Sequence, residues 1–243
     1  MPTIGLLYPG SSAEDDFPRL ERRLGTDLRL PVVHTSVGED AHRVDALLDL
    51  GSTERLAEGA RTLVAEHRPD SIMWACTSGS FVFGWQGAHD QVRALQAHTG
   101  LPTSSTSLAF VEACRALSID RVSVAASYPR DVAERFVAFL DHGDIAVTAL
   151  GSHGIVTAAE VGTLGYEQVE AIATGADASG GAEAVLIPDT AMHSLQWIDK
   201  LEAAVGLPVL TANQVTVWQG IKLLGDVPRY DMLGTLFRTP DGG

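Results

Sequence analysis

The sequence predicts an α/β fold made of two pseudo-symmetric lobes, each a parallel sheet flanked by helices, with the active site in the cleft between them. Apolar segments of strand length alternate with amphipathic segments of helical length along the chain, which is typical of right-handed βαβ units. Several apolar segments are unbroken runs of Val, Ile, Leu and Ala, as in parallel strands buried on both faces. A short internal repeat then indicates two related halves.

Eight segments are predicted to be strands, with Gly, Pro or polar residues at their ends: 3–8, 30–35, 71–75, 102–105, 121–126, 145–150, 184–188 and 208–211. Seven segments between them have the apolar spacing of amphipathic helices: 52–67, 86–99, 108–117, 129–142, 165–175, 194–205 and 215–224. The tail after Leu236, which ends TPDGG, is predicted to be frayed.

The repeat consists of GLPTSSTSLAFVEACRAL and GLPVLTANQVTVWQGIKLL. Each copy has a helix-ending Gly, a short strand, a Ser/Thr/Asn-rich turn and an amphipathic helix. Upstream of them, SIMWACTSGS and AVLIPDTAMH form a matching pair, whose loops carry Cys76 and Asp189. A pseudo-twofold axis would make these loops face each other, although generic α/β patterning is an alternative explanation. We predict an N-terminal lobe of residues 1–115 plus 216–243 on the Cys76 side, and a C-terminal lobe of residues 116–215 on the Asp189 side.

The composition excludes several classes of protein. The 243 residues include 17 basic and 31 acidic side chains, a formal net charge of −14, which disfavours binding to nucleic acid. No apolar run approaches the roughly 18–20 residues that span a bilayer, so no membrane partner is expected. The N-terminal MPTIGLLYPG lacks the basic segment of a signal peptide, and two cysteines are no disulfide framework. We therefore expect a soluble, cytoplasmic protein.

Small and hydroxyl-bearing residues follow four of the predicted strands, at 9–12, 76–79, 127–129 and 189–191. Ligands of α/β sheets bind at the carboxyl ends of strands, where free backbone N–H groups point outward. Neither GxGxxG nor GxxxxGK[ST] occurs, and these loops contain almost no Lys or Arg. This combination favours a small carboxylate over a polyphosphate.

Cys76 is the strongest candidate for a catalytic residue, because it follows a predicted strand and lies at the start of the next helix. There a thiol pKa can fall from about 8.5 toward 7 or lower, and the thiolate can attack a carbon or transfer a proton. The alternative is a buried structural cysteine. Cys114 lies within an amphipathic helical pattern and is predicted to fill the core.

Asp189 ends an apolar strand, where it is either an acid/base or the N-cap of the following helix. Tyr128 is either a phenol of the site or a packed ring. The eight histidines show no HExxH pattern and there is no CxxC, so no metal site is expected; His153 and His193 lie in candidate loops. The absence of GxSxG disfavours a serine hydrolase.

These residues resemble the Asp/Glu racemase superfamily, in its branch of maleate cis-trans isomerases and arylmalonate decarboxylases. The resemblance rests on IGLLYP, WACTSGSFVFG, RVSVAASYPRDVAERFVAFL, AVLIPDTAMHSLQWIDKLEAAVGLPVLTANQ and YDMLGTLF. It implies two lobes, no cofactor and a dimer. Racemase-type members place one cysteine in each lobe; Cys76 matches the first, and Asp189 stands where the second would be. Thr77, Ser78 and Tyr128 match residues that hold a substrate carboxylate.

The chain also departs from both members of this branch. Maleate isomerases carry an Asn in the first loop, which here reads PGSS at 9–12, and a second Asn is replaced by Ala158 or a neighbour. Arylmalonate decarboxylases keep the second cysteine and have a glycine in place of the first, which is the reverse of this chain.

The resemblance implies a cofactor-independent isomerase or lyase that acts on a small mono- or dicarboxylic acid through a Cys76 thiolate and an enediolate or covalent-adduct intermediate. The alternatives are a racemase-like or hydrolytic Cys/Asp enzyme, or a non-catalytic binding protein for a small acid. We expect no cofactor, no metal, and a homodimer or higher homo-oligomer. The predicted catalytic residues are Cys76 and Asp189, and the predicted substrate-binding residues are Pro9, Ser11, Thr77, Ser78, Tyr128 and Thr190.

Overall fold

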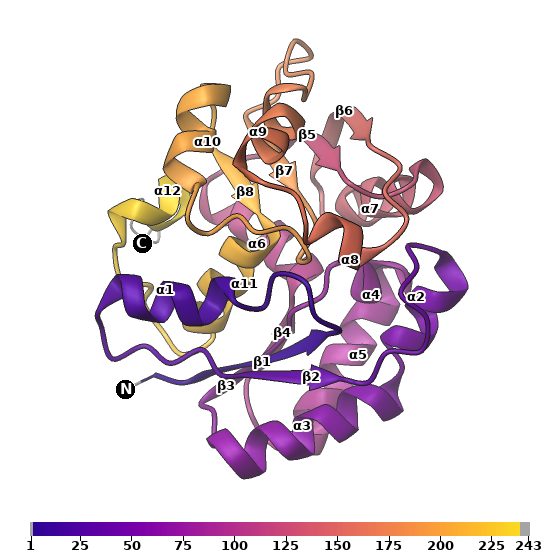
Figure 1. The fold of residues 1–243 in the computed structure, drawn as a ribbon, viewed down its shortest axis with the longest axis vertical. Helices are drawn as coiled ribbons and strands as arrows, with labels where there is room; N and C mark the ends of the chain where they lie inside the picture. Colours follow the sequence, from indigo (N-terminus) through magenta and orange to yellow (C-terminus); the bar gives the residue numbers. More distant parts are fainter. Residues whose placement is uncertain (1, 239–243) are drawn as a thin grey trace.

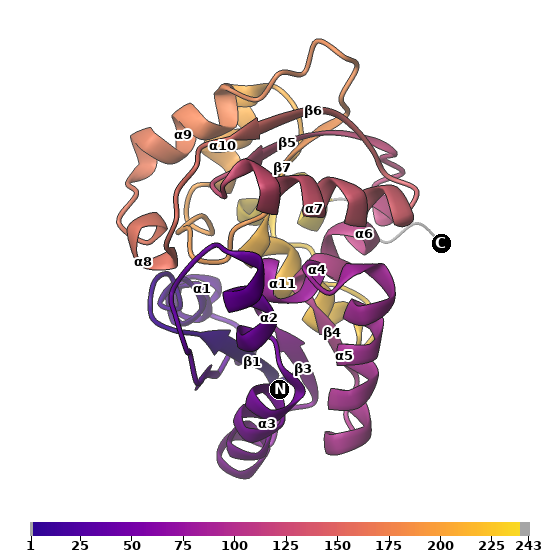
Figure 2. The ribbon, with the colours of Figure 1, turned by 90° about the vertical axis from the view of Figure 1, so that its right-hand side faces the viewer.

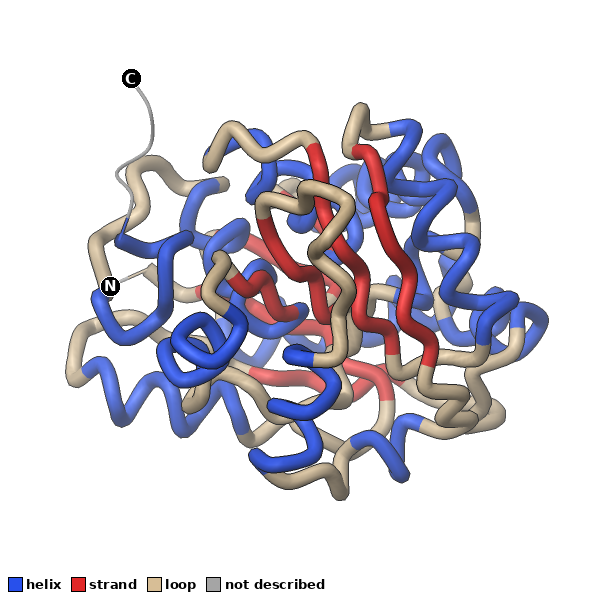
Figure 3. Tube along the Cα trace, turned by 90° about the horizontal axis from the view of Figure 1, so that it is seen from above, coloured by secondary structure: helices blue, strands red, loops and turns tan. Residues whose placement is uncertain are grey.

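The computed structural model describes residues 2–238 and contains two four-stranded parallel sheets (Figure 1). The first has the order β2-β1-β3-β4 and the second β6-β5-β7-β8, so both halves share one topology. All eight predicted strands are confirmed: β1 (Ile4–Pro9), β2 (Val32–Thr35), β3 (Ser71–Trp74), β4 (Thr103–Ser105), β5 (Arg121–Ala126), β6 (Ala146–Ser152), β7 (Ala184–Ile187) and β8 (Val209–Thr211). The sheets lie in the interior and helices surround them (Figure 3). The predicted two-lobed α/β class is therefore confirmed.

The seven predicted helices are also present: α3 (Thr53–His67), α5 (Gly84–Thr99), α6 (Thr106–Ala116), α7 (Arg130–His142), α9 (Tyr166–Thr174), α10 (Ile198–Val205) and α11 (Ala212–Lys222). The helix expected from residue 194 begins only at Ile198. The backbone N–H groups of Ser194 and Leu195 donate to the buried carboxylate of Asp16 instead, at 2.8 and 3.1 Å, and this holds the segment against the first half of the chain.

Six short elements were not expected from the sequence: α1 (Asp16–Leu24), α2 (Val44–Leu50), α4 (Ser78–Phe81), α8 (Ala158–Val161), the 3-10 helix η1 (Asp231–Leu233) and α12 (Gly234–Arg238). Most are too short to show a helical period. In α1, Pro18 obscures the pattern, although a proline in the first turn removes no intrahelical hydrogen bond. Of the tail predicted to fray, residues 237–238 belong to α12, and 239–243 lie outside the described residues.

The internal repeat corresponds to equivalent parts of the two halves. Gly100 and Gly206 end α5 and α10 in the left-handed conformation, with φ of 72° and 76°, which glycine adopts without strain. The helices that follow, α6 and α11, pack against each other at the junction of the halves (Figure 2). The hydroxyls of Thr106 and Thr216, 2.6 Å apart, join them. Because α11 contacts strands of both sheets, the lobe boundaries at 115/116 and 215/216 stay a prediction.

The core is largely one apolar cluster that runs through both halves, with a smaller cluster beside β7 and α9. Cys114 is fully buried in the large cluster, as expected for a packing residue. Among residues 2–238, no helix is long and apolar enough to cross a membrane.

Candidate active site

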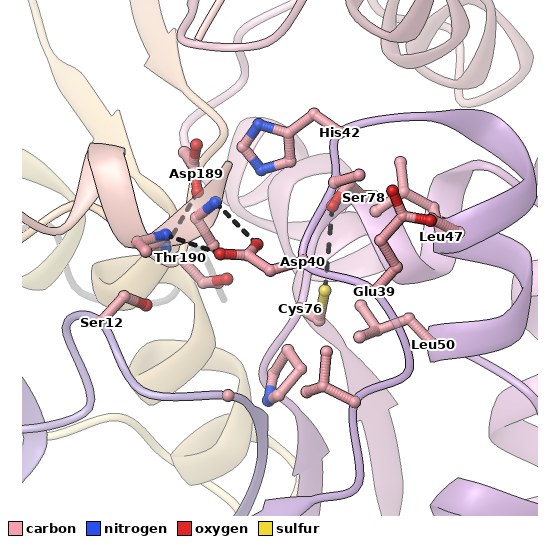
Figure 4. A pocket seen from close by; sticks show the side chains of 18 of the residues that line it. Ser12, Glu39, Asp40, His42, Leu47, Leu50, Cys76, Ser78, Asp189 and Thr190 are labelled. Carbon is pink, nitrogen blue, oxygen red and sulfur yellow. Dashed lines mark hydrogen bonds between the residues drawn. The ribbon is translucent and has the colours of Figure 1, made fainter. Parts of the chain in front are cut away.

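One pocket of about 280 Å³ lies where the two halves meet (Figure 4). Its walls are the loops after β1, β2, β3 and β7, together with parts of α2 and α8. Six of the eight predicted site residues line it: Cys76, Asp189, Pro9, Ser11, Ser78 and Thr190. The other two, Thr77 and Tyr128, are almost fully buried and do not line the pocket. The structure thus brings loops from both halves of the repeat to one cavity.

Cys76 occupies the turn between β3 and α4. Its Sγ accepts a hydrogen bond from the backbone N–H of Gly79 at 3.3 Å and lies 3.9 Å from the hydroxyl of Ser78. A Cβ atom at Gly79 would lie 3.0 Å from both this sulfur and the Trp74 ring, so a larger residue would crowd the thiol. From the sequence, the helix that follows this turn is expected to lower the pKa of the thiol.

Burial raises the pKa of the Cys76 thiol to about 12, and the nearby negative charge of Asp189 acts in the same direction. The hydrogen bonds from Gly79 and Ser78 lower the pKa but do not compensate. The expectation of a lowered thiol pKa is therefore wrong for the free protein. Cys76 is only 3% exposed, and a single-turn helix contributes little against the loss of solvation.

Asp189 is held in a tight turn and not at a helix terminus. One carboxylate oxygen accepts the N–H of Ala191 at 2.9 Å, and the other accepts the hydroxyl of Ser127. Because α10 begins only at Ile198, the predicted role of Asp189 as a helix cap is wrong. Asp189 is 4% exposed, and its carboxylate is a fixed part of the pocket wall.

Two tyrosines hold the backbone on either side of Asp189. The hydroxyl of Tyr128, from the second half, donates to the carbonyl of Pro188. The hydroxyl of Tyr8, from the first half, donates to the carbonyl of Thr190 at 2.9 Å. Burial raises the pKa of both phenols well above the usual range, so both keep their protons. In this structure the Tyr128 proton is committed to a backbone carbonyl and does not point at a ligand.

The sequence did not reveal Tyr8 as a pocket residue, because it lies inside the apolar run of β1. It also did not reveal the loop between β2 and α2, where Asp40 and His42 line the pocket. The Asp40 carboxylate accepts the N–H groups of Ala158 and Ala159, at 2.9 and 3.1 Å. This places Ala158 in the pocket wall, in the region where the sequence suggested a lost Asn.

His42 adds a second link between the halves. Its backbone N–H donates to the carbonyl of Val156 at 2.8 Å, and its Nδ1 lies 2.9 Å from the carbonyl of Ile155. Since a carbonyl only accepts, Nδ1 carries a proton. Together with the Asp40 contacts, these bonds close one side of the pocket. The only sequence signal for a site in this loop is the polar run GEDAHR, and such runs are common on protein surfaces.

The remaining wall is apolar and is formed by Leu47 and Leu50 of α2. Gln91 of α5 supports it from behind: its Nε2 donates to the carbonyls of Gly51 and Gly79, at 2.7 and 2.9 Å. One buried amide therefore connects the end of α2 with the turn that contains Cys76. An interior helical Gln gives no sequence signal for such a role.

The side chains that line the pocket are negatively charged or neutral. Glu39, Asp40 and Asp189 line it, and none of its described lining residues is Lys or Arg. Neither His153 nor His193 is among the lining residues; the Nε2 of His193 lies 2.6 Å from a carboxylate oxygen of Asp15. Among residues 2–238, no cluster of three or more His, Cys, Asp or Glu side chains has the arrangement to hold a metal ion.

The two halves have identical α/β topology, with a cysteine after one β-strand and an acidic residue at the equivalent place in the other half. They define a two-lobed α/β protein with its candidate site between the lobes. The model of the arylmalonate decarboxylase family matches residues 44–237, and the chain belongs to that family. This finding confirms the resemblance seen in the sequence.

The relatives include both an isomerase and a lyase. The arylmalonate decarboxylase of Bordetella bronchiseptica is 27% identical over 236 residues, which cover 92% of this chain and 91% of the relative. A maleate isomerase of Nocardia farcinica is 28% identical over 235 residues, with 93% and 90% covered. The chain is thus a member of an isomerase and lyase family.

The solved structures agree with this assignment. A cysteine-to-serine variant of the Nocardia farcinica maleate cis-trans isomerase, with a covalently bound succinylcysteine intermediate, has a TM-score of 0.86 at 25% identity and covers 98% of each chain. A liganded variant of arylmalonate decarboxylase has a TM-score of 0.83 at 23% identity, with 98% of this chain and 99% of that chain covered, and shows the shared fold.

Proposed function

We propose that this protein is a cofactor-independent decarboxylase of small malonic acids that carry a substituent on the central carbon, with the Cys76 thiol as the acid that protonates that carbon. The observation that carries the proposal is the state of this thiol. Cys76 is the pocket's cysteine, it is buried, and its pKa of about 12 keeps it protonated near neutral pH. A neutral thiol can donate a proton, whereas nucleophilic attack requires the thiolate.

The proposed reaction needs only groups in the pocket. One carboxylate of the substrate lies next to Leu47 and Leu50, where weak solvation favours its loss as carbon dioxide. The breaking C–C bond leaves its electron pair in an enediolate on the remaining carboxylate. Cys76 gives its proton to one face of the central carbon, and the thiolate regains a proton from water. The N–H of Gly79 and the hydroxyl of Ser78 stabilise the transient thiolate.

Asp189 contributes a fixed negative charge to the opposite wall. Its interaction with Cys76 raises the thiol pKa and so keeps the proton on sulfur until an enediolate forms. Since Asp189 replaces a second thiol, protonation from the Cys76 face is favoured, and in D2O the deuterium should enter the α-carbon from one face only. A homodimer without a cofactor is part of the proposal.

A second candidate function is cis-trans isomerisation of a maleate-like acid by addition of the thiolate to the double bond. The observation that favours it is the Gly79 N–H, which lies 3.3 Å from Sγ and would stabilise a thiolate. The Nocardia farcinica relative with its succinylcysteine intermediate supports the same chemistry. Isomerisation requires a substrate whose binding lowers the thiol pKa, because the free protein holds a neutral thiol.

One NMR experiment in D2O separates the two candidates. The protein is incubated with methylmalonate, phenylmalonate and maleate in parallel. Decarboxylation predicts carbon dioxide release and one deuterium at the α-carbon of the product, with maleate unchanged. Conversion of maleate to fumarate, with both malonates intact, would instead establish the second candidate. A Cys76→Ser sample run alongside shows whether either conversion depends on the thiol.

A further inference from the structure

The hydrogen bonds around Tyr8 fix the direction of a serine hydroxyl in the pocket. The Tyr8 hydroxyl has three partners: the Thr190 carbonyl at 2.9 Å, the Ala13 N–H at 3.0 Å and the Ser12 hydroxyl at 2.8 Å. The carbonyl can only accept and the N–H can only donate. The single Tyr8 proton therefore goes to Thr190, and the Ser12 hydroxyl must donate its own proton to Tyr8.

Ser12 lines the pocket, and with its proton committed it can only accept hydrogen bonds from a ligand. The Asp189 carboxylate on the same side is also an acceptor, and each of its oxygens holds one protein donor and keeps further lone pairs. Figure 4 shows Ser12, Thr190 and Asp189 together on one side of the pocket. Of these three side chains, the Thr190 hydroxyl alone can donate to a ligand.

The opposite side is mixed in character. Figure 4 shows Cys76, Ser78 and Glu39 there, apart from Ser12 and Asp189. The Tyr128 proton goes to the Pro188 carbonyl, so Ser78, which also bonds to the Tyr128 hydroxyl, donates its proton to that oxygen. The thiol proton of Cys76 is then free to turn to a ligand. The side beside Ser12 and Asp189 is therefore the one whose hydrogen-bonding character is fixed, as a pair of acceptors.

From these acceptors we infer that the natural substrate is a carboxylic acid whose reacting carbon also carries a hydroxyl or an ammonium group. The hydroxyl or ammonium protons point at Ser12 and Asp189. The inference rests on the proposed function in taking the compound to be a malonic acid. A methyl or phenyl substituent at this place would leave Ser12 and Asp189 without a partner in a desolvated pocket.

The test compares hydroxymalonate, aminomalonate and methylmalonate, which differ only in an OH, NH3+ or CH3 group of similar size. We expect kcat/KM for hydroxymalonate or aminomalonate to exceed that for methylmalonate by about ten-fold or more. Which of the two is preferred identifies the donor group. The affinity of each compound is measured in parallel, as protection of Cys76 from alkylation.

Ser12→Ala removes the acceptor and should bring the ratio between hydroxymalonate and methylmalonate to within about three-fold. Ser179→Ala, in an exposed loop away from the pocket, is the matched control and should keep the wild-type ratio. Circular dichroism establishes that both variants are folded.

The outcomes separate this inference from the proposed function. Equal turnover of the three malonates overturns the inference and supports the decarboxylase. No turnover, with hydroxymalonate or aminomalonate still protecting Cys76 about ten-fold better than methylmalonate, supports the inference and overturns the decarboxylase. Failure of all three compounds to bind overturns both.

Discussion

The hydroxyls of Tyr8 and Tyr128 donate to the carbonyls of residues 190 and 188, so the backbone of Asp189 is held on both sides by phenols from opposite halves of the molecule. Neither ring supplies a proton to a ligand in this arrangement. Both fix the start of the loop that leads to α10 at Ile198, and the bonds from Ser194 and Leu195 to Asp16 hold the later part of that loop.

Removing one phenol should therefore disturb catalysis through geometry. We expect Tyr128→Phe to lower kcat by about ten-fold or more, because a small displacement of Asp189 and Thr190 has a large effect on a pre-organised site. Unfolding should become easier by about 1–3 kcal/mol, since the buried Pro188 carbonyl loses its partner. Kinetics and urea denaturation measure the two effects. Tyr230→Phe, outside the pocket, is the control; unchanged kcat in Tyr128→Phe would show that the bond to Pro188 does not matter for catalysis.

The raised pKa of Cys76 predicts slow alkylation of the free protein. With a pKa near 12 against an ordinary value of 9.0, the rate of reaction with iodoacetamide should keep rising above pH 10 without a plateau. A Cys114→Ala background leaves one thiol to follow. Asp189→Asn removes a negative charge near Sγ and should move the profile to lower pH. Asp177→Asn makes the same charge change at an exposed turn and should not. A plateau below pH 9 in the parent would mean that the thiol is not desolvated.

The same shift has a consequence for stability. Both buried cysteines have pKa values raised to about 12 by burial. Below pH 9 the thiols are protonated in the folded and the unfolded chain, and the folded state keeps its full stability. Between pH 9 and 12 the unfolded chain releases these protons and the folded chain does not, so the free energy of unfolding should fall as the pH rises. Cys114→Ala should flatten this slope in urea titrations, and an unchanged slope would contradict the assignment.

Substitutions of Cys76 and Cys114 should have clearly different effects on kcat. Cys76→Ser replaces the thiol with a far weaker acid of similar size, and we expect kcat to fall by about 100-fold or more with the fold retained. Cys114→Ser changes a core position in α6 and should lower stability while kcat stays within about two-fold. Retained activity in Cys76→Ser would remove this residue from the mechanism, and a comparable loss in both variants would point to a structural cause.

Much of this architecture could be read from the sequence because it depends on patterns that are local and repeated. Buried parallel strands leave continuous apolar runs, and the two GLP segments mark equivalent helix ends. Cys76 and Asp189 could be found for the same reason, since strand ends are where ligands bind.

The residues that the sequence did not reveal act through long-range contacts. Tyr8 resembles any core residue of β1 until its hydroxyl is seen to reach Thr190, 182 positions away. Asp40 meets Ala158 across 118 positions. The thiol pKa was predicted in the wrong direction because helix position can be read from the sequence, whereas the depth of burial depends on how the two halves pack.

Gln91 gives the last prediction, because it tests whether support from behind the pocket sets the properties of the thiol. Its amide donates to Gly51 and Gly79, and the N–H of Gly79 in turn donates to Cys76. Gln91→Leu leaves two buried carbonyls without donors and should lower the free energy of unfolding by about 1–3 kcal/mol. It should also loosen the Gly79 turn, weaken the hydrogen bond to sulfur and move the alkylation profile of Cys76 to still higher pH.

Gln96→Leu, exposed on the same helix, is the matched control and should change stability by less than about 0.5 kcal/mol, with the thiol profile unchanged. Both variants are compared in the Cys114→Ala background by urea denaturation and by alkylation at several pH values. Loss of stability in Gln91→Leu with an unaltered thiol profile would make Gln91 a packing residue only. A profile that moves to lower pH would mean that the loosened turn admits water to the sulfur, and that solvation outweighs the Gly79 hydrogen bond at this site.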